Sequence, residues 1–113
     1  MTKRILTFSD IHGQLDKLNK LLKIINYNPK EDLLIGLGDY VDRGIQNVEL
    51  LYEIKKLKEQ GAIFLRGNHD HLTLGTISEL LNKNSTVKII MHKQCGGYNT
   101  YKELKKLNNK QLK

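Results

Sequence analysis

Three short apolar runs, each followed at once by a cluster of polar residues, constrain the fold of this chain more than any other feature. The runs are residues 5–8, 33–37 and 62–65, and they are rich in strand-forming side chains. The polar clusters that follow are residues 9–13, 38–44 and 67–70. Carboxylate and imidazole side chains are costly to bury unless a metal ion, a phosphate or a partner side chain compensates them. The repeated pattern therefore predicts three strands that end at one functional rim.

Apolar residues with helical spacing separate the three runs. The stripes fall in residues 15–25, 48–57 and 74–81, and they are interpreted as core-facing. Asn28-Pro29 and Gly61 are expected to end the first two helices. Residues 87–91 fit either a strand or a helix. The lysine-rich segment 98–113 predicts a polar helical tail, with a weak apolar stripe and no evident packing partner.

Strand-helix alternation of this kind predicts an α/β fold with a parallel sheet and right-handed crossovers. In such sheets the functional residues collect in the loops at the carboxyl ends of the strands. We therefore expect seven side chains to share one rim although they are far apart in sequence: Asp10, His12, Asp39, Asp42, Arg43, Asn68 and His69.

The length of 113 residues indicates a single domain or part of one, and no apolar run is long enough to cross a bilayer or to form a signal peptide. The single cysteine, Cys95, fits a cytoplasmic protein. The net charge of +7 comes from scattered lysines without aromatic residues spaced for base stacking. A solvated basic surface is thus favoured over a nucleic-acid binder.

The side chains of the rim suit zinc, manganese or iron better than calcium. Two such ions that share Asp39 could activate water and clamp a phosphoryl group. An arginine could bind phosphate oxygens, and a histidine that is not a ligand could protonate a leaving oxygen. The alternative for each residue taken singly is a cap of a helix or turn, a role that Asp and Asn often have.

The motifs Asp10-Ile11-His12, Gly38-Asp39-Tyr40-Val41-Asp42-Arg43-Gly44 and Gly67-Asn68-His69-Asp70 resemble the three consecutive signatures of the calcineurin-like metallophosphoesterases. They are most similar to the branch that contains serine/threonine protein phosphatases and symmetrical diadenosine tetraphosphatases. The resemblance covers about residues 4–70, and Gly96-Gly97 with Thr100 resembles a weaker stretch of bacterial and phage members.

This resemblance implies a role for each matching residue. Asp10 and His12 would bind one metal ion, Asp39 would bridge two, and Asn68 would bind the second ion and the substrate phosphate. His69 would be the general acid, oriented by Asp42. Arg43 would hold the substrate phosphate, and a metal-bridging water would attack phosphorus directly.

The chain also departs from the family pattern. Asp70 stands where the family more often has Glu, and the family's two further histidine ligands and second phosphate-binding arginine have no counterpart. The resemblance therefore implies the N-terminal half of a two-sheet αββα sandwich, truncated at its C-terminal side. Arg66 and His71 are interpreted as surface residues, and His92 and Cys95 as structural or incidental.

We expect from the resemblance a metal-dependent phosphoesterase with two divalent ions, manganese foremost. The substrate could be a phosphoprotein, a dinucleoside polyphosphate or a small phosphoester. The alternative is a weak or inactive half that acts through a partner, either a complementary C-terminal half or a second copy of itself.

Overall fold

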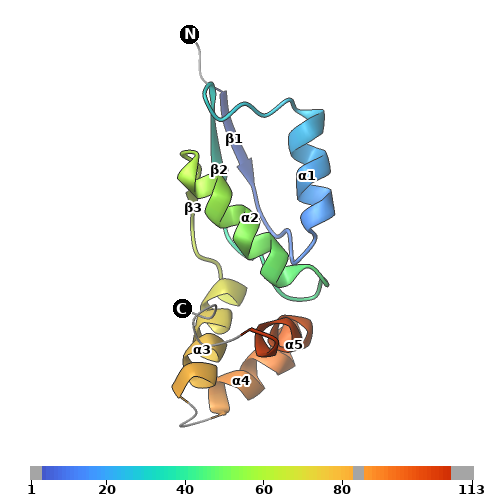
Figure 1. The fold of residues 1–113 in the computed structure, drawn as a ribbon, viewed down its shortest axis with the longest axis vertical. Helices are drawn as coiled ribbons and strands as arrows, with labels where there is room; N and C mark the ends of the chain where they lie inside the picture. The colour runs from blue at the N-terminus through green and yellow to red at the C-terminus, as the bar shows by residue number, and fades with distance from the viewer. Residues whose placement is uncertain (1–3, 83–85, 108–113) are drawn as a thin grey trace.

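The sheet of this protein has three parallel strands. The computed structural model describes residues 4–82 and 86–107. Strands β1 (Arg4–Phe8), β2 (Asp32–Gly36) and β3 (Ile63–Phe64) lie in the order β1-β2-β3. Helices α1 (Leu15–Ile24) and α2 (Asn47–Glu59) connect them (Figure 1). The predicted α/β fold with a parallel sheet is confirmed.

One face of the sheet packs against these two helices. Phe8 and Leu34 of the sheet form a core with Leu18 of α1 and with Leu50 and Leu57 of α2. Side chains alternate along a strand, so the intervening residues point to the other face. That face, called the open sheet face below, consists of side chains paired across the strands: Ile5, Leu33, Ile35 and Ile63. Ile5 is 67% exposed and Ile63 is 47% exposed.

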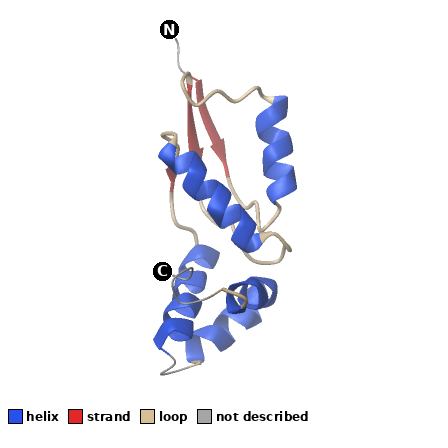
Figure 2. Ribbon diagram, in the orientation of Figure 1, coloured by secondary structure: helices blue, strands red, loops and turns tan. Residues whose placement is uncertain are grey.

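A helical group lies beyond the carboxyl ends of the strands (Figure 2). It contains α3 (Asn68–Asn82), α4 (Val87–His92), a kinked turn (Lys93–Gly97) and α5 (Tyr98–Lys105). The molecule is elongated, with extents of 52 × 24 × 20 Å. None of the described helices is long and apolar enough to cross a membrane.

The second half of the chain differs from the sequence-based expectations at several places. Residues 68–70 were expected in a loop, but they form the first turn of α3, because the Asp70 carboxylate accepts a hydrogen bond from the Gly67 amide and closes the turn. The ambiguous segment 87–91 is helical. Helix α5 does have packing partners, since it contacts α2 and α3. The end of the predicted tail, residues 108–113, lies outside the described residues.

The buried side of α3 is polar. Thr73, Thr76 and Glu79 are buried, whereas Leu74 of the predicted apolar stripe is 46% exposed. The polar side chains are buried because each meets a partner from the next helix. Thr73 and Thr76 contact His92, and Glu79 accepts a hydrogen bond from the Ile89 amide. The prediction that Leu74 faces the core was therefore wrong.

Candidate active site

The loops that follow β1 and β2 hold an unusual backbone. Within the described residues, five non-glycine residues of these loops have positive φ between 45° and 76°: Asp10, His12, Asp39, Asp42 and Arg43. Backbone conformations of this kind cost free energy and often cluster at functional sites. Hydrogen bonds between the two loops offset the cost. The amides of Asp10 and His12 donate to the carbonyl oxygens of Gly38 and Asp39.

Asp70 connects the third cluster to the second. Its carboxylate accepts hydrogen bonds from the amides of Asp39, Tyr40 and Gly67, at 2.7, 3.0 and 2.8 Å. A carboxylate that accepts three backbone N–H groups holds those groups at fixed positions. Asp70 thus ties the loop after β2 to the first turn of α3, a role that sequence reasoning did not assign to it.

Three of the predicted site residues come together as a candidate metal centre. Asp10, His12 and Asp39 each offer one ligand atom, and these atoms all lie within 4.8 Å of one another. The His12 Nδ1 atom lies 2.8 Å from the carbonyl oxygen of Val41. Because a carbonyl oxygen only accepts, Nδ1 carries the hydrogen, and Nε2 keeps its lone pair for a metal ion.

The Asp39 carboxylate is held in its charged form. Burial by itself would raise the pKa of Asp39. Hydrogen bonds from the His69 amide and with the Asp10 side chain outweigh burial, and the net pKa of Asp39 is lowered. Two carboxylates and one imidazole form a donor set that suits a divalent transition metal ion. The residues present therefore fit the metal that the motifs imply.

His69 and Asp42 form a buried pair beside these ligands. The His69 Nδ1 atom lies 2.8 Å from Oδ2 of Asp42, whose side chain is fully buried. The His12 and His69 rings meet edge to face, with centroids 4.9 Å apart. His69 therefore lies next to the candidate metal centre, with its Nδ1 atom engaged by Asp42.

Sequence reasoning missed the other partners of Asp42. His92 Nε2 lies 2.7 Å from Asp42 Oδ1, and the Thr100 hydroxyl donates to the same oxygen at 2.7 Å. Burial would raise the pKa of Asp42, but the hydrogen bonds from His92, Thr100 and His69 lower it. Of the two interpretations of His92, structural or incidental, the structure supports the first, because His92 is fully buried against this carboxylate. His92 follows Ile89 by three residues, so the two lie on the same helix face, and this spacing was the sequence signal that His92 is buried.

The remaining predicted residues lie at the edge of the site. Arg43 has an exposed side chain, and its amide donates to the carbonyl oxygen of Gly96 at 2.9 Å. Asn68 is the exposed first residue of α3, beside His69, whose amide donates to Asp39. The structure thus brings Asp10, His12 and Asp39 together and places Asp42, Arg43, Asn68 and His69 around the same rim.

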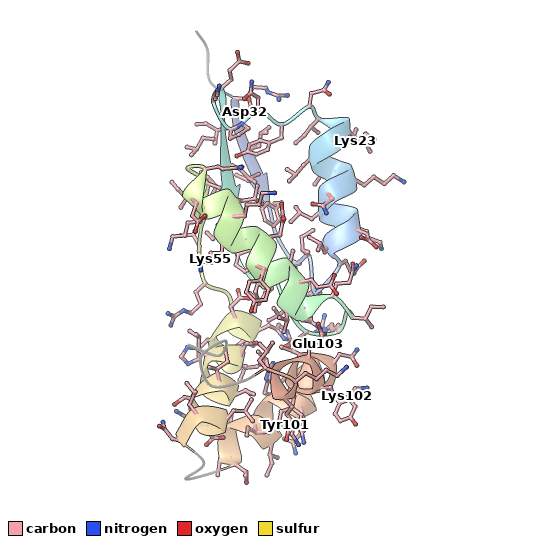
Figure 3. The ribbon with its side chains drawn as sticks, in the orientation of Figure 1. Lys23, Asp32, Lys55, Tyr101, Lys102 and Glu103 are labelled. Carbon is pink, nitrogen blue, oxygen red and sulfur yellow. The ribbon has the colours of Figure 1, made fainter. Side chains whose placement is uncertain are left out.

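Helix α5 also stabilises this rim, through hydrogen bonds to the start of α2. The Glu103 carboxylate accepts hydrogen bonds from the Val48 amide and the Asn47 side chain at the first turn of α2. Figure 3 shows Glu103 where α5 meets the start of α2. Asn47 in turn accepts a hydrogen bond from the Asp42 amide at 2.8 Å. The conformation of the loop that holds Asp42 therefore depends on Glu103, which lies 56 positions after Asn47 in the sequence.

Arg66 and His71 lie outside the cluster, as expected from the sequence. Both are exposed and line an apolar cavity of about 400 Å³ between α3 and α4. Cys95 is exposed within the kinked turn. None of these three side chains contributes to the group formed by Asp10, His12 and Asp39.

Comparisons with known proteins identify relatives of this chain. A profile of the calcineurin-like phosphoesterase family matches residues 3–111. A symmetrical bis(5'-nucleosyl)-tetraphosphatase of Actinobacillus pleuropneumoniae is 44% identical over 68 residues, 60% of this chain and 25% of the relative. Serine/threonine-protein phosphatase 1 of Salmonella typhimurium is 33% identical over 64% of this chain and 32% of its own length.

A solved structure supports the same relationship. The crystal structure of a protein assigned as a diadenosine tetraphosphatase superposes with a TM-score of 0.59 at 26% identity. The match covers 82% of this chain and 38% of that protein. The chain therefore spans about a quarter to two fifths of the length of these relatives.

Proposed function

This chain belongs to the calcineurin-like phosphoesterase family, and from that premise we propose that it hydrolyses phosphate esters with divalent metal ions bound at the rim of its sheet. One observation carries the proposal: the Asp10, His12 and Asp39 ligand atoms converge beside a histidine-carboxylate pair. A metal site next to a potential proton donor is the arrangement that phosphate ester hydrolysis needs.

The proposed ligand set uses both strand-end loops and the start of α3. Asp10 and His12 would hold one ion, Asp39 would be shared between two, and Asn68 would contribute to the second. When bound, such ions supply Lewis-acid activation of water and neutralise charge on the phosphate. Manganese, iron and zinc all accept these donors, and manganese is our first choice for assays.

The other residues would act on the substrate. Because Asp42 accepts from Nδ1–H of His69, Nε2 faces the substrate, and with both ring nitrogens carrying hydrogen His69 would give its Nε2 proton to the leaving oxygen. The exposed guanidinium of Arg43 would bind phosphate oxygens in a fork. Asn68, beside His69, would contribute a hydrogen bond to the same phosphate.

The substrate class follows from the relatives as a proposal. Their names point to dinucleoside polyphosphates and phosphoproteins, and a small phosphomonoester would enter the same open rim. The single cysteine supports a reducing, cytoplasmic setting.

A second candidate rests on the open sheet face. Ile5 and Ile63 expose apolar surface of a kind that usually marks an interaction site. We propose as the alternative a weakly active chain that is completed by a partner, either a complementary polypeptide half or a second copy.

The test is hydrolysis of p-nitrophenyl phosphate with added Mn²⁺ by the wild type, Asp39→Asn and His69→Asn. We expect metal-dependent turnover that falls by a factor of about 10² or more in each variant. Asp16→Asn, an exposed carboxylate of α1, is the matched control and should keep wild-type turnover. Turnover that is equal in all four proteins would refute the proposed function.

A further inference from the structure

His92 is the most completely enclosed titratable side chain outside the site residues predicted from the sequence. It has 0% exposure, and both ring nitrogens contact polar groups. Nδ1 lies 2.7 Å from the Thr76 hydroxyl, and Nε2 lies 2.7 Å from Asp42 Oδ1. The imidazole therefore spans the space between α3 and the loop after β2.

The direction of each hydrogen bond follows from its neighbours. The Thr73 hydroxyl donates to the His69 carbonyl oxygen at 2.9 Å, so towards His92 Nε2 at 3.3 Å it can only accept. Asp42, as a carboxylate, also only accepts. His92 Nε2 must therefore carry a hydrogen, which it donates to Asp42 Oδ1.

Asp42 is thus fixed by three donors on its two oxygens. Oδ1 accepts from His92 Nε2 and from the Thr100 hydroxyl, and Oδ2 accepts from His69 Nδ1. If the His92 donor were lost, only the Thr100 hydroxyl would hold Oδ1, and the carboxylate would rotate more freely about its Cβ–Cγ bond, because that torsion is broad. His69 would then lose the acceptor that selects its tautomer.

Gly97 makes room for this arrangement. A Cβ atom on Gly97 would lie within van der Waals overlap of the His92 ring, at the Cδ2 and Nε2 atoms. The ring thus packs directly on the backbone of the kinked turn. That contact leaves the imidazole little freedom to move away from Asp42.

We propose that His92 is a positioning residue of the catalytic site: its Nε2–H fixes the Asp42 carboxylate, which in turn accepts from His69 Nδ1–H and so directs His69 Nε2, the atom that carries the proton for the leaving oxygen, toward the substrate. The catalytic consequence rests on the proposed function. The hydrogen bonds from Thr76 through His92 and Asp42 to His69 are a feature of the structure and do not depend on the proposed function.

The first test observes the chain of hydrogen bonds directly, in metal-free protein at one pH. Long-range ¹H–¹⁵N spectra of the histidine rings report the tautomer of His69 and the exchange rate of its ring proton. The variants are His92→Phe, which keeps a similar ring shape without a donor, and His92→Gln, whose amide can donate near the Nε2 position. His71→Phe, an exposed histidine of α3, is the control.

We expect the wild type, His92→Gln and His71→Phe to show the Nδ1–H form of His69 with a slowly exchanging proton. In His92→Phe that proton should exchange at least about tenfold faster, and the second tautomer should appear. A folded His92→Phe with unchanged His69 signals would overturn the proposal. If His92→Phe does not fold, Gly97→Ala decides, because its Cβ would displace the His92 ring from Asp42: faster exchange supports the proposal and unchanged exchange overturns it.

The second test separates this inference from the proposed function. With Mn²⁺, His92→Phe should slow phenyl phosphate more than p-nitrophenyl phosphate, by about tenfold, because the poorer leaving group needs protonation more. An equal loss on both substrates contradicts a positioning role in acid catalysis. If the wild type shows no turnover, the proposed function fails, while the spectra still decide the role of His92.

Discussion

The Nδ1 atom of His69 lies 2.8 Å from Oδ2 of Asp42, although the two residues are 27 positions apart in sequence. His92, 50 positions after Asp42, holds the other carboxylate oxygen at 2.7 Å. The loop after β2 is therefore fixed by helices from the second half of the chain. Changes in α4 and α5 should consequently affect the rim of the sheet.

Glu103→Gln should destabilise the protein by about 1–2 kcal/mol. The carboxylate caps the start of α2 by accepting from the Val48 amide and the Asn47 side chain, and an amide would face the Asn47 donor with a donor of its own. Urea unfolding measures the change. Glu59→Gln, an exposed residue in the last turn of α2, should stay within about 0.5 kcal/mol of wild type.

Gly97→Ala and Gly75→Ala should have opposite effects on stability. A Cβ at Gly97 would overlap the His92 ring, so this variant should lose about 1–3 kcal/mol. A Cβ at Gly75, inside α3, would come 3.1 Å from the flexible Lys88 side chain and should gain up to about 1 kcal/mol from helix propensity. Thermal unfolding compares the two. Equal melting temperatures for both variants would contradict the packing described for His92.

The Arg4–Asp32 ion pair predicts a pH dependence of stability. Arg4 forks onto both oxygens of Asp32 at 2.9 and 2.8 Å, and this interaction lowers the pKa of Asp32. The unfolded chain therefore binds the proton more tightly, and stability is lost as the pH falls from the usual carboxyl range through the lowered pKa.

The measurement for this pair is the free energy of unfolding between pH 3 and pH 6. Wild type should lose more stability over this interval than Asp32→Asn, because the variant has no carboxylate to protonate. Asp16→Asn should follow the wild-type curve, since Asp16 is exposed on α1. If Asp32→Asn and the wild type have parallel curves, the ion pair does not contribute as described.

The open sheet face predicts association through Ile5 and Ile63. Replacing both by Thr keeps strand propensity and removes exposed apolar area. We expect sedimentation velocity to show a lower average mass for the double variant than for the wild type at the same concentration. The pair Ile24→Thr and Ile45→Thr, also exposed but outside the sheet, should leave association unchanged.

Much of this fold was predictable from local sequence signals. The periodicity of residues 15–25 and 48–57 matches α1 and α2 closely, because each helix has a true apolar face against the sheet. The strand-end rule correctly placed Asp10, His12 and Asp39 together, since it depends only on parallel strands. The roles of these residues remain proposals.

The polar interior of the helical group was not predictable in the same way. Thr73, Thr76, Glu79 and His92 are buried because they meet one another, the Ile89 amide or Asp42, and such pairings leave no periodic apolar signal. The first turn of α3 was missed for a related reason. Asp70 stabilises it through backbone amides of a loop that is distant in sequence.

The most direct test of the proposed metal centre is calorimetric titration of Mn²⁺ into the metal-free chain, with the wild type beside Asp39→Asn and Asp16→Asn. We expect at least one binding event that weakens about tenfold or more in Asp39→Asn, because the shared carboxylate is lost, and that is unchanged in Asp16→Asn. The same affinity in all three proteins would contradict a metal centre at Asp10, His12 and Asp39.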